Sequence, residues 1–236
     1  MKIGIFGDSF ADDYNLWPSH FDRVGPSWIE YIRDQDIEVD NYAFSGSGLY
    51  YSYEKFISNF RKYDKIIFLV TTPGRISLPD KDGKYSHWYG PAMVERDLAT
   101  CFDYNKKVRL NAVRDYFAYV KNDEFDNLVH DLLIERILKT HDSMLMIPSF
   151  IHSRIQNLMS FIKISEFEAT FWNLTDVLPN SQGLQDARKC HMCEENNLMV
   201  GEEIFNWIKT DKFNLDPAKF KTPTREFEHY FRKQPW

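Results

Sequence analysis

The residues of this chain that could carry out acyl transfer are one serine, one histidine and a set of glycine-containing turns. Ser9 follows a short apolar segment directly, in the run Gly7-Asp8-Ser9-Phe10. His191 lies far along the chain, just before a segment with helical periodicity. A serine hydroxyl becomes a nucleophile when a histidine accepts its proton, and backbone N–H groups stabilise the oxyanion that forms. These residue types predict acyl-transfer chemistry if the fold brings them together.

The positions of the turns predict that they meet. Apolar segments at residues 2–6, 37–44 and 65–70 are predicted to be strands, and helical patterns at residues 27–32 and 50–61 separate them. Alternating strands and helices predict a parallel sheet covered by helices on both faces. In such sheets, ligands bind beyond the carboxyl ends of the strands. The turns after the three strands, at residues 7–10, 45–48 and 71–75, are therefore expected at one edge.

The remaining chain predicts one domain with an insertion. We expect a three-layer α/β/α sandwich with a central, mostly parallel sheet of about five strands, covering residues 1–210. An inserted loop and helical region lies around residues 77–140, and a tail over residues 211–236 is expected to pack on the domain. The predicted elements after the third strand are an aromatic-rich excursion at 77–91, helices at 94–120 (with a break) and 124–139, a strand at 143–147, a helix at 149–161, a strand at 168–174, a loop at 179–190 and a helix at 192–208.

Three motifs, in order, resemble those of the SGNH (GDSL-like) hydrolase family. Residues 6–10 (FGDSF) resemble the first motif, residues 41–46 (NYAFSG) the second, and residues 191–197 (HMCEENN) the final histidine motif. The resemblance runs from residue 3 to about residue 209. It implies a flavodoxin-like fold with Ser9 as nucleophile and His191 as general base. It also implies that the N–H groups of Ser9 and Gly46 hold the oxyanion.

Two positions depart from the family pattern. The family supplies an oxyanion asparagine after the third strand, where this chain has Pro73, which offers neither an amide side chain nor an N–H group. Thr72 or Arg75 could substitute, and a guanidinium could also bind an anionic group of the substrate. The family also places an aspartate three residues before the histidine, where this chain has Arg188.

Two interpretations therefore remain for the group that orients His191. Asp186 could reach the histidine if its loop bulges, or the site could be a Ser–His dyad oriented by a backbone carbonyl. Asp8 is expected to shape the turn that presents Ser9, next to the substrate, and Asn41 is expected to be a structural hydrogen bonder at the end of a strand.

We therefore expect a serine esterase that hydrolyses a carboxylic ester, with an O-acetyl or short acyl group on a carbohydrate as a candidate. Aromatic residues of the excursion, Tyr85, Trp88 and Tyr89 among them, could form a lid that stacks on sugar rings. The alternatives are a catalytically weak ligand-binding protein of the same fold, or an acyltransferase with the same Ser–His machinery. Neither a metal nor an organic cofactor is required.

Other classes fit the sequence less well. The cysteines and histidine at residues 190–193 lack a second ligand pair for zinc, and residues 7–13 lack the lysine and glycine spacing of a nucleotide site. A net charge of −6 without blocks of like charge argues against nucleic acid, and no apolar run is long enough to cross a membrane. Three cysteines and an amino terminus without a secretory pattern predict a cytoplasmic protein, or a phage or bacterial one released by lysis. Oligomeric state stays open.

Overall fold

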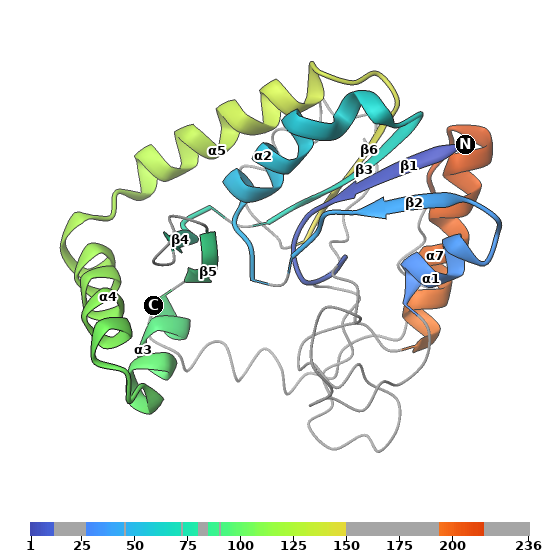
Figure 1. Cartoon of the computed structure of the whole chain (residues 1–236). Coiled ribbons are helices and arrows are strands. Elements are labelled where there is room, and N and C mark those ends of the chain that lie inside the picture. The colour runs from blue at the N-terminus through green and yellow to red at the C-terminus, as the bar shows by residue number, and fades with distance from the viewer. Residues whose placement is uncertain are drawn as a thin grey trace.

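The centre of the molecule is a four-stranded parallel sheet in the order β2-β1-β3-β6 (Figure 1). The computed structural model describes residues 1–11, 27–44, 46–71, 73–79, 85–89, 91–149 and 194–214. The strands are β1 (Lys2–Phe6), β2 (Glu38–Asn41), β3 (Lys65–Val70) and β6 (Met144–Pro148). Ile5 of β1 lies opposite Asn41 of β2 on one side and Ile67 of β3 on the other, so the carboxyl ends of these strands meet at one edge.

Strand β3 lies within the sheet and is buried along its whole length. Its sequence KIIFLV is continuously apolar after Lys65, as expected for a parallel strand covered on both faces. The aliphatic stem of Lys65 is buried too, while its ammonium group pairs with Asp211 at 2.5 Å. This contact fixes the residue that follows the last described helix against the sheet.

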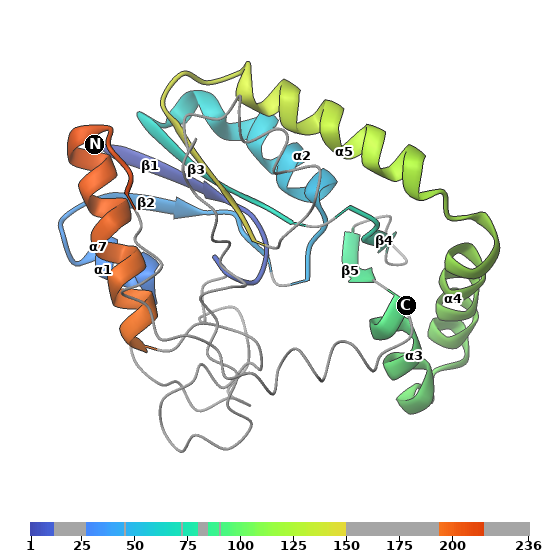
Figure 2. The ribbon, with the colours of Figure 1, turned by 180° about the vertical axis from the view of Figure 1, so that it is seen from behind.

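Helices cover both faces of the sheet, which confirms the three-layer α/β/α prediction. Helices α2 (Leu49–Asn59) and α5 (Asp123–Leu138) lie on one face, and α1 (Trp28–Arg33) and α7 (Glu194–Thr210) pack together on the other (Figures 1 and 2). The strand order matches the flavodoxin-like arrangement, with β6 as its fourth strand. The predicted helix at 149–161, strand at 168–174 and tail beyond residue 214 lie outside the described residues.

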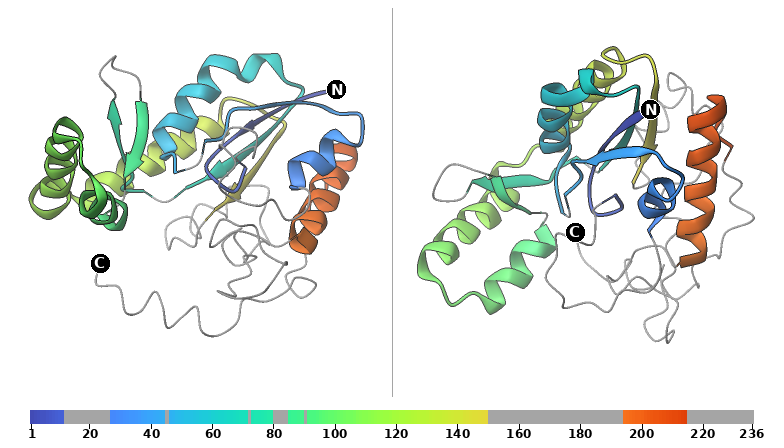
Figure 3. Two further views of the ribbon diagram at one scale, coloured as in Figure 1. Left: turned by 60° about the horizontal axis from the view of Figure 1, so that its bottom comes forward. Right: turned by 45° about the vertical axis from the view of Figure 1, so that its right-hand side comes forward.

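The excursion after β3 contains regular structure that the sequence analysis did not predict. Strands β4 (Ile76–Pro79) and β5 (Tyr85–Tyr89) form an antiparallel hairpin within the predicted excursion at 77–91. Pro79 and the charged segment that follows it hid the strand pattern, and the pairing is irregular between Leu78 and Pro79. The hairpin projects beyond the sheet (Figure 3).

The predicted helix at 94–120 is divided, as its pattern indicated. Helix α3 (Pro91–Thr100) ends before Asp103, whose carboxylate accepts a hydrogen bond from the N–H of Lys106 at 2.7 Å and caps α4 (Tyr104–Asp115). A π-helical turn, η3 (Tyr116–Val120), then leads into α5. Within the described part of the chain, no helix combines the length and apolarity needed to cross a bilayer.

Candidate active site

The turn after β1 is built around a fully buried aspartate. Oδ1 of Asp8 accepts hydrogen bonds from the N–H of Phe10 at 3.2 Å and from the hydroxyl of Ser149 at 3.1 Å. The carbonyl of Asp8 accepts from the N–H of Ala11 at 3.1 Å. Its Oδ2 atom is buried without a hydrogen-bond partner among the described residues. Asp8 therefore shapes the turn that carries Ser9, as predicted, and Ser9 keeps 9% of its surface exposed.

Gly7 is required at this turn because β3 passes too close for a side chain. A Cβ atom on Gly7 would lie 2.5 Å from the Cβ of Leu69, and its φ of +157° is unfavourable for other residues. This contact explains why the Asp-Ser pair follows a glycine here. The carboxyl end of β1 is thereby held against the adjacent strand.

The second turn is bonded to the first through the carbonyl of Gly7. That oxygen accepts hydrogen bonds from the N–H of Phe44 at 3.1 Å, the hydroxyl of Ser47 at 2.9 Å and the hydroxyl of Ser52 at 3.2 Å. Ser47 and Ser52 are buried, and Ser52 belongs to the first turns of α2. The start of α2 and the turn before it are thus fixed to the backbone next to Asp8.

Gly46 and Asn41 define the path of this second turn. Gly46 has a φ of +77°, in the left-handed region that glycine adopts without strain. The side chain of Asn41 donates to the carbonyl of Ala11 at 2.6 Å and accepts from the N–H of Ala43 at 2.9 Å. The predicted structural role of Asn41 is confirmed, because its amide joins the first and second turns.

The third turn reaches the second through Arg75. Nη1 of Arg75 donates to the carbonyl of Ser47 at 3.0 Å, next to Gly46. Burial lowers the pKa of Arg75, and the negative charge of Asp8 nearby opposes that change. The guanidinium stays protonated because its ordinary pKa is so high. Thr72, the other predicted substitute for the missing asparagine, lies outside the described residues.

The backbone before Arg75 is supported from α5. Nε2 of buried His130 lies 2.8 Å from the carbonyl of Thr71, the first residue after β3. His130 is therefore a core histidine with a polar partner, as expected for a histidine without a motif around it. Gly74 has a φ of +84° and lies close to the side chain of Lys121, so the turn bends back toward the start of α5.

A chain of contacts links the beginning of α7 to the residue after Ser9. Oδ1 of Asn197 accepts from the N–H of Trp28 at 3.4 Å, and the indole N–H of Trp28 donates to the carbonyl of Phe10 at 2.8 Å. Trp28 and Asn197 are both buried. His191 and Asp186 lie outside the described residues, as does the cysteine-containing segment considered for zinc. The described residues contain no group of three His, Cys, Asp or Glu arranged to hold a metal.

The structure thus brings together Asp8, Ser9, Gly46 and Arg75 at the carboxyl edge of the sheet. Sequence reasoning missed the residues that join their turns. Three of them are small polar residues whose partners lie on other segments, and the fourth is an aromatic residue counted only as an apolar helix position. They are Ser47, Ser52, Ser149 and Trp28. A serine shortly after a predicted strand was the available signal, and it was present for Ser47 and Ser149.

Solved structures similar to this chain are lipases and esterases. A lipase/acylhydrolase from Enterococcus faecalis is 14% identical, with a TM-score of 0.39 over 94% of this chain and 98% of that one. A lipase from a goat rumen metagenome is 11% identical, with a TM-score of 0.41 over 87% and 96%. A catalytic mutant of an acetylxylan esterase from Geobacillus stearothermophilus is 11% identical, with a TM-score of 0.34 over 95% and 97%.

No protein-family model matches the chain, and no curated protein matches its sequence. At these identities and TM-scores, the fold is assigned from the strand order of this chain, which defines a flavodoxin-like α/β/α protein. Its chemistry is inferred from its own residues.

Proposed function

We propose that this chain is a serine esterase in which Ser9 attacks the carbonyl carbon of a carboxylic ester. The observation that carries the proposal is the construction of the turn after β1. Ser9 lies between Asp8, which is fully buried and hydrogen-bonded, and Phe10, whose carbonyl is held by Trp28. A nucleophile has to be held in one geometry to react efficiently, and both neighbours of Ser9 are fixed.

The oxyanion is stabilised in this proposal by the backbone N–H groups of Ser9 and Gly46. Their turns are bonded to each other through the carbonyl of Gly7, so the two donors are held in a constant relation. Such preorganised donors stabilise the charge that develops on the carbonyl oxygen during attack. The left-handed φ of Gly46 sets the direction of its peptide group, which a residue with a side chain would adopt only with strain.

In this proposal, Arg75 positions the second turn, which contains Gly46, and so replaces the missing asparagine. Its guanidinium is hydrogen-bonded to the carbonyl of Ser47, so it joins the third turn to the second, and the charge of Asp8 in the first turn lies near it. We therefore assign Arg75 a positioning role rather than direct contact with the reacting carbonyl. Replacement by alanine should lower kcat more than it raises KM, because the oxyanion donors shift while substrate binding persists.

His191 is the proposed base, with Asp186 as the candidate that orients it. The contact of Asn197 with Trp28, and of Trp28 with Phe10, supports this assignment because it joins the beginning of α7 to the nucleophile turn. His191 precedes α7 by three positions. His191 accepts the proton of Ser9, then protonates the leaving alcohol, and water finally hydrolyses the acyl–enzyme ester.

The proposed substrate is an ester of a short acyl group, with O-acetylated carbohydrate as the first class to test. The hairpin strand β5 contains Tyr85, Trp88 and Tyr89, residue types that stack on sugar rings. The acetylxylan esterase among the similar structures acts, by its name, on an acetylated glycan. The support for a glycan is thus compositional, whereas the support for ester chemistry comes from the turn geometry.

The test is hydrolysis of p-nitrophenyl acetate by the wild-type chain and by Ser9→Ala, His191→Ala and Ser143→Ala. Loss of the nucleophile or base should lower kcat by about a thousandfold or more. Ser143 is a half-buried serine that directly precedes β6, at the opposite edge of the sheet, so its variant should match wild type. Labelling by a fluorophosphonate, mapped by mass spectrometry, should occur on Ser9 alone. Equal turnover by Ser9→Ala and wild type would exclude the proposal.

A further inference from the structure

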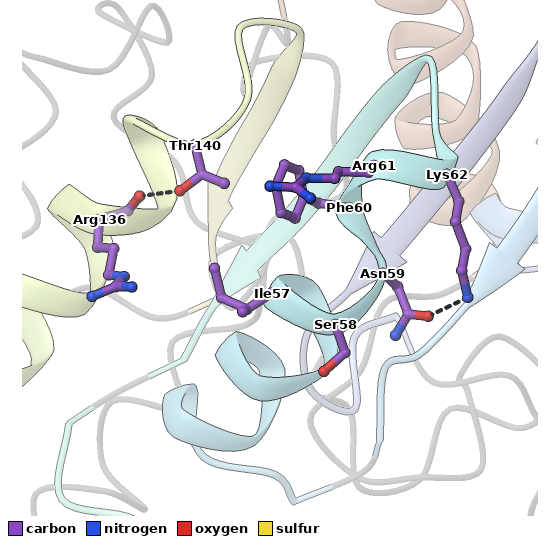
Figure 4. Close-up of a pocket in the computed structure, with 8 residues that line it drawn as sticks. All are labelled: Ile57, Ser58, Asn59, Phe60, Arg61, Lys62, Arg136 and Thr140. Carbon is purple, nitrogen blue, oxygen red and sulfur yellow. Dashed lines mark hydrogen bonds between the residues drawn. The ribbon is translucent and has the colours of Figure 1, made fainter.

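A pocket lies at the amino-terminal edge of the sheet, opposite the turns of the candidate active site. Its volume is about 470 Å³, and it opens between the end of α2 and the last turn of α5. It includes the short 3-10 turn η2 (Phe60–Lys62), which leads into the amino end of β3. Its lining residues are Ile57, Ser58, Asn59, Phe60, Arg61, Lys62, Arg136 and Thr140 (Figure 4).

The lining of this pocket is cationic and contains no acidic residue. Arg61, Lys62 and Arg136 contribute three positive charges, and none of them forms a salt bridge with a carboxylate in the part of the chain that the structure describes. Nζ of Lys62 instead donates to the side-chain oxygen of Asn59 at 2.7 Å, at the rim of the pocket. The neighbouring cation Lys139 lies outside the lining and is paired with Glu135.

Aromatic rings support the two guanidinium groups. The guanidinium of Arg61 lies over the ring of Phe60, 5.4 Å from its centroid, and that of Arg136 lies 5.9 Å from the centroid of Tyr53. Stacking on a ring occupies the face of a guanidinium and leaves the N–H groups at its edge available for an anion. Figure 4 shows the two arginines on opposite walls, one from η2 and one from α5.

The remaining walls define the size and polarity of a ligand. Ile57 and the ring of Phe60 supply apolar surface, while Ser58, Asn59 and Thr140 supply polar groups. The hydroxyl of Thr140 already donates to the carbonyl of Arg136 at 2.6 Å, which leaves its oxygen as an acceptor. The volume exceeds that of a single inorganic anion, so it fits an oxyanion attached to an organic group.

We propose that this pocket binds a multivalent oxyanion, either a phosphate ester or a polycarboxylate. Guanidinium groups bind both kinds of oxygen by paired, charge-assisted hydrogen bonds. A chain with a net charge of −6 repels anions on average, so a group of three cations facing one pocket, without a salt bridge among the described residues, is a local exception. The site is separate from Ser9, because it lies at the amino-terminal edge of the parallel sheet.

The experiment is calorimetric titration of the full chain with pyrophosphate and, separately, with citrate, at constant ionic strength. Saturable binding of at least one of them is expected. The double variant Arg61→Gln/Arg136→Gln should weaken that binding by about tenfold or more, because each charge-assisted contact contributes strongly. Binding of pyrophosphate alone assigns the phosphate class, and binding of citrate alone assigns the carboxylate class.

The matched control is Lys139→Gln, which removes one positive charge from the residue that ends α5, outside the lining of the pocket. It should change the affinity by less than about twofold, since exposed charges act weakly at a distance. Arg61→Lys/Arg136→Lys keeps the charge and loses the planar fork, so its affinity should fall between those of wild type and the glutamine variant. Circular dichroism checks that each variant is folded. Absence of saturable binding, or an equal loss in Lys139→Gln, overturns the proposal, and hydrolysis by Ser9 decides nothing in either case.

Discussion

Two hydrophobic clusters of this chain differ in how many elements they join. The main cluster contains side chains from β1, β3, β6 and helices α1, α2, α5 and α7, so it covers both faces of the sheet. The second cluster consists of Val94, Leu110 and Val113, with a few partly buried neighbours, and among the side chains that the structure describes it joins α3, α4 and η3. Around it, Phe102 and Tyr119 are 100% and 85% exposed. The difference predicts that the first cluster holds the ends of β1 and β3 in place, and that the second cluster contributes less to the candidate site.

Phe68→Ala tests the main cluster and should have the largest effect. Phe68 is fully buried on β3 and its ring contacts those of Phe6 and Phe56. Removing a buried aromatic ring leaves a cavity, and we expect the free energy of unfolding to fall by about 3–5 kcal/mol. Urea denaturation followed by circular dichroism measures it. A loss below about 1 kcal/mol would mean that the sheet can collapse around the cavity.

Gly7→Ala tests how closely β1 and β3 must approach at the site. The new methyl group would meet the Cβ of Leu69 at 2.5 Å, so one strand has to move. We expect a loss of about 1–3 kcal/mol in the free energy of unfolding. Esterase activity should fall as well, because the same movement displaces Ser9. Wild-type stability and activity together would show that Leu69 gives way without disturbing the turn.

Leu110→Ala tests the second cluster. Leu110 is fully buried, but few side chains surround it, and we expect a loss of about 2 kcal/mol, at the low end for leucine. The loss should be local. Hydrogen exchange should increase in α3 and α4 and stay unchanged in β1 and β3, while ester hydrolysis persists. Faster exchange throughout the sheet would contradict the separation of the two clusters.

Asp126→Asn should have the smallest effect, and it should be stabilising. Burial raises the pKa of Asp126, against the charge of Lys121, and Oδ2 is buried without a partner among the described residues. A carboxyl with a raised folded-state pKa favours the folded state at low pH, and this contribution is lost as the pH rises through that pKa. The variant should therefore be more stable than wild type at pH 7, by less than about 1 kcal/mol.

The pH dependence is the control for this last effect. Thermal unfolding of both chains should converge below the ordinary pKa of 3.8, where the carboxyl of Asp126 is protonated in both states. A constant difference at all pH values would assign the effect to packing instead of charge.

The sequence predicted the sheet better than the contacts that complete the site. Strand β3 was predicted with its observed bounds because an apolar run between Asp64 and Thr71 has one interpretation in a parallel sheet. The hairpin was missed because proline and charged residues interrupt its alternation. The turn at Asp8 was predicted from local geometry, since its backbone partner is two residues away.

The contacts between turns depend on residues far apart in the chain. Arg75 and Ser47 are separated by 28 residues, and Trp28 and Asn197 by 169. Periodicity and turn preferences describe local structure, so they cannot select one partner among many polar residues at such separations. For the same reason, the sequence identified Arg75 as a candidate to stabilise the oxyanion or to bind an anionic substrate group, but it could not identify the hydrogen bond of Arg75 to the carbonyl of Ser47.

The hydrogen bonds to the carbonyl of Gly7 let the turn that contains Ser9 keep its geometry when a neighbouring side chain is substituted. An acceptor in the backbone cannot be deleted by a point substitution, and its three donors come from Phe44, Ser47 and Ser52. One of these donors is itself a backbone N–H group. A lineage could therefore lose either serine hydroxyl, with two donors remaining, and restore it later. The sequence of the second turn, which contains Gly46, can therefore change through such neutral intermediates while the turn that contains Ser9 keeps its geometry.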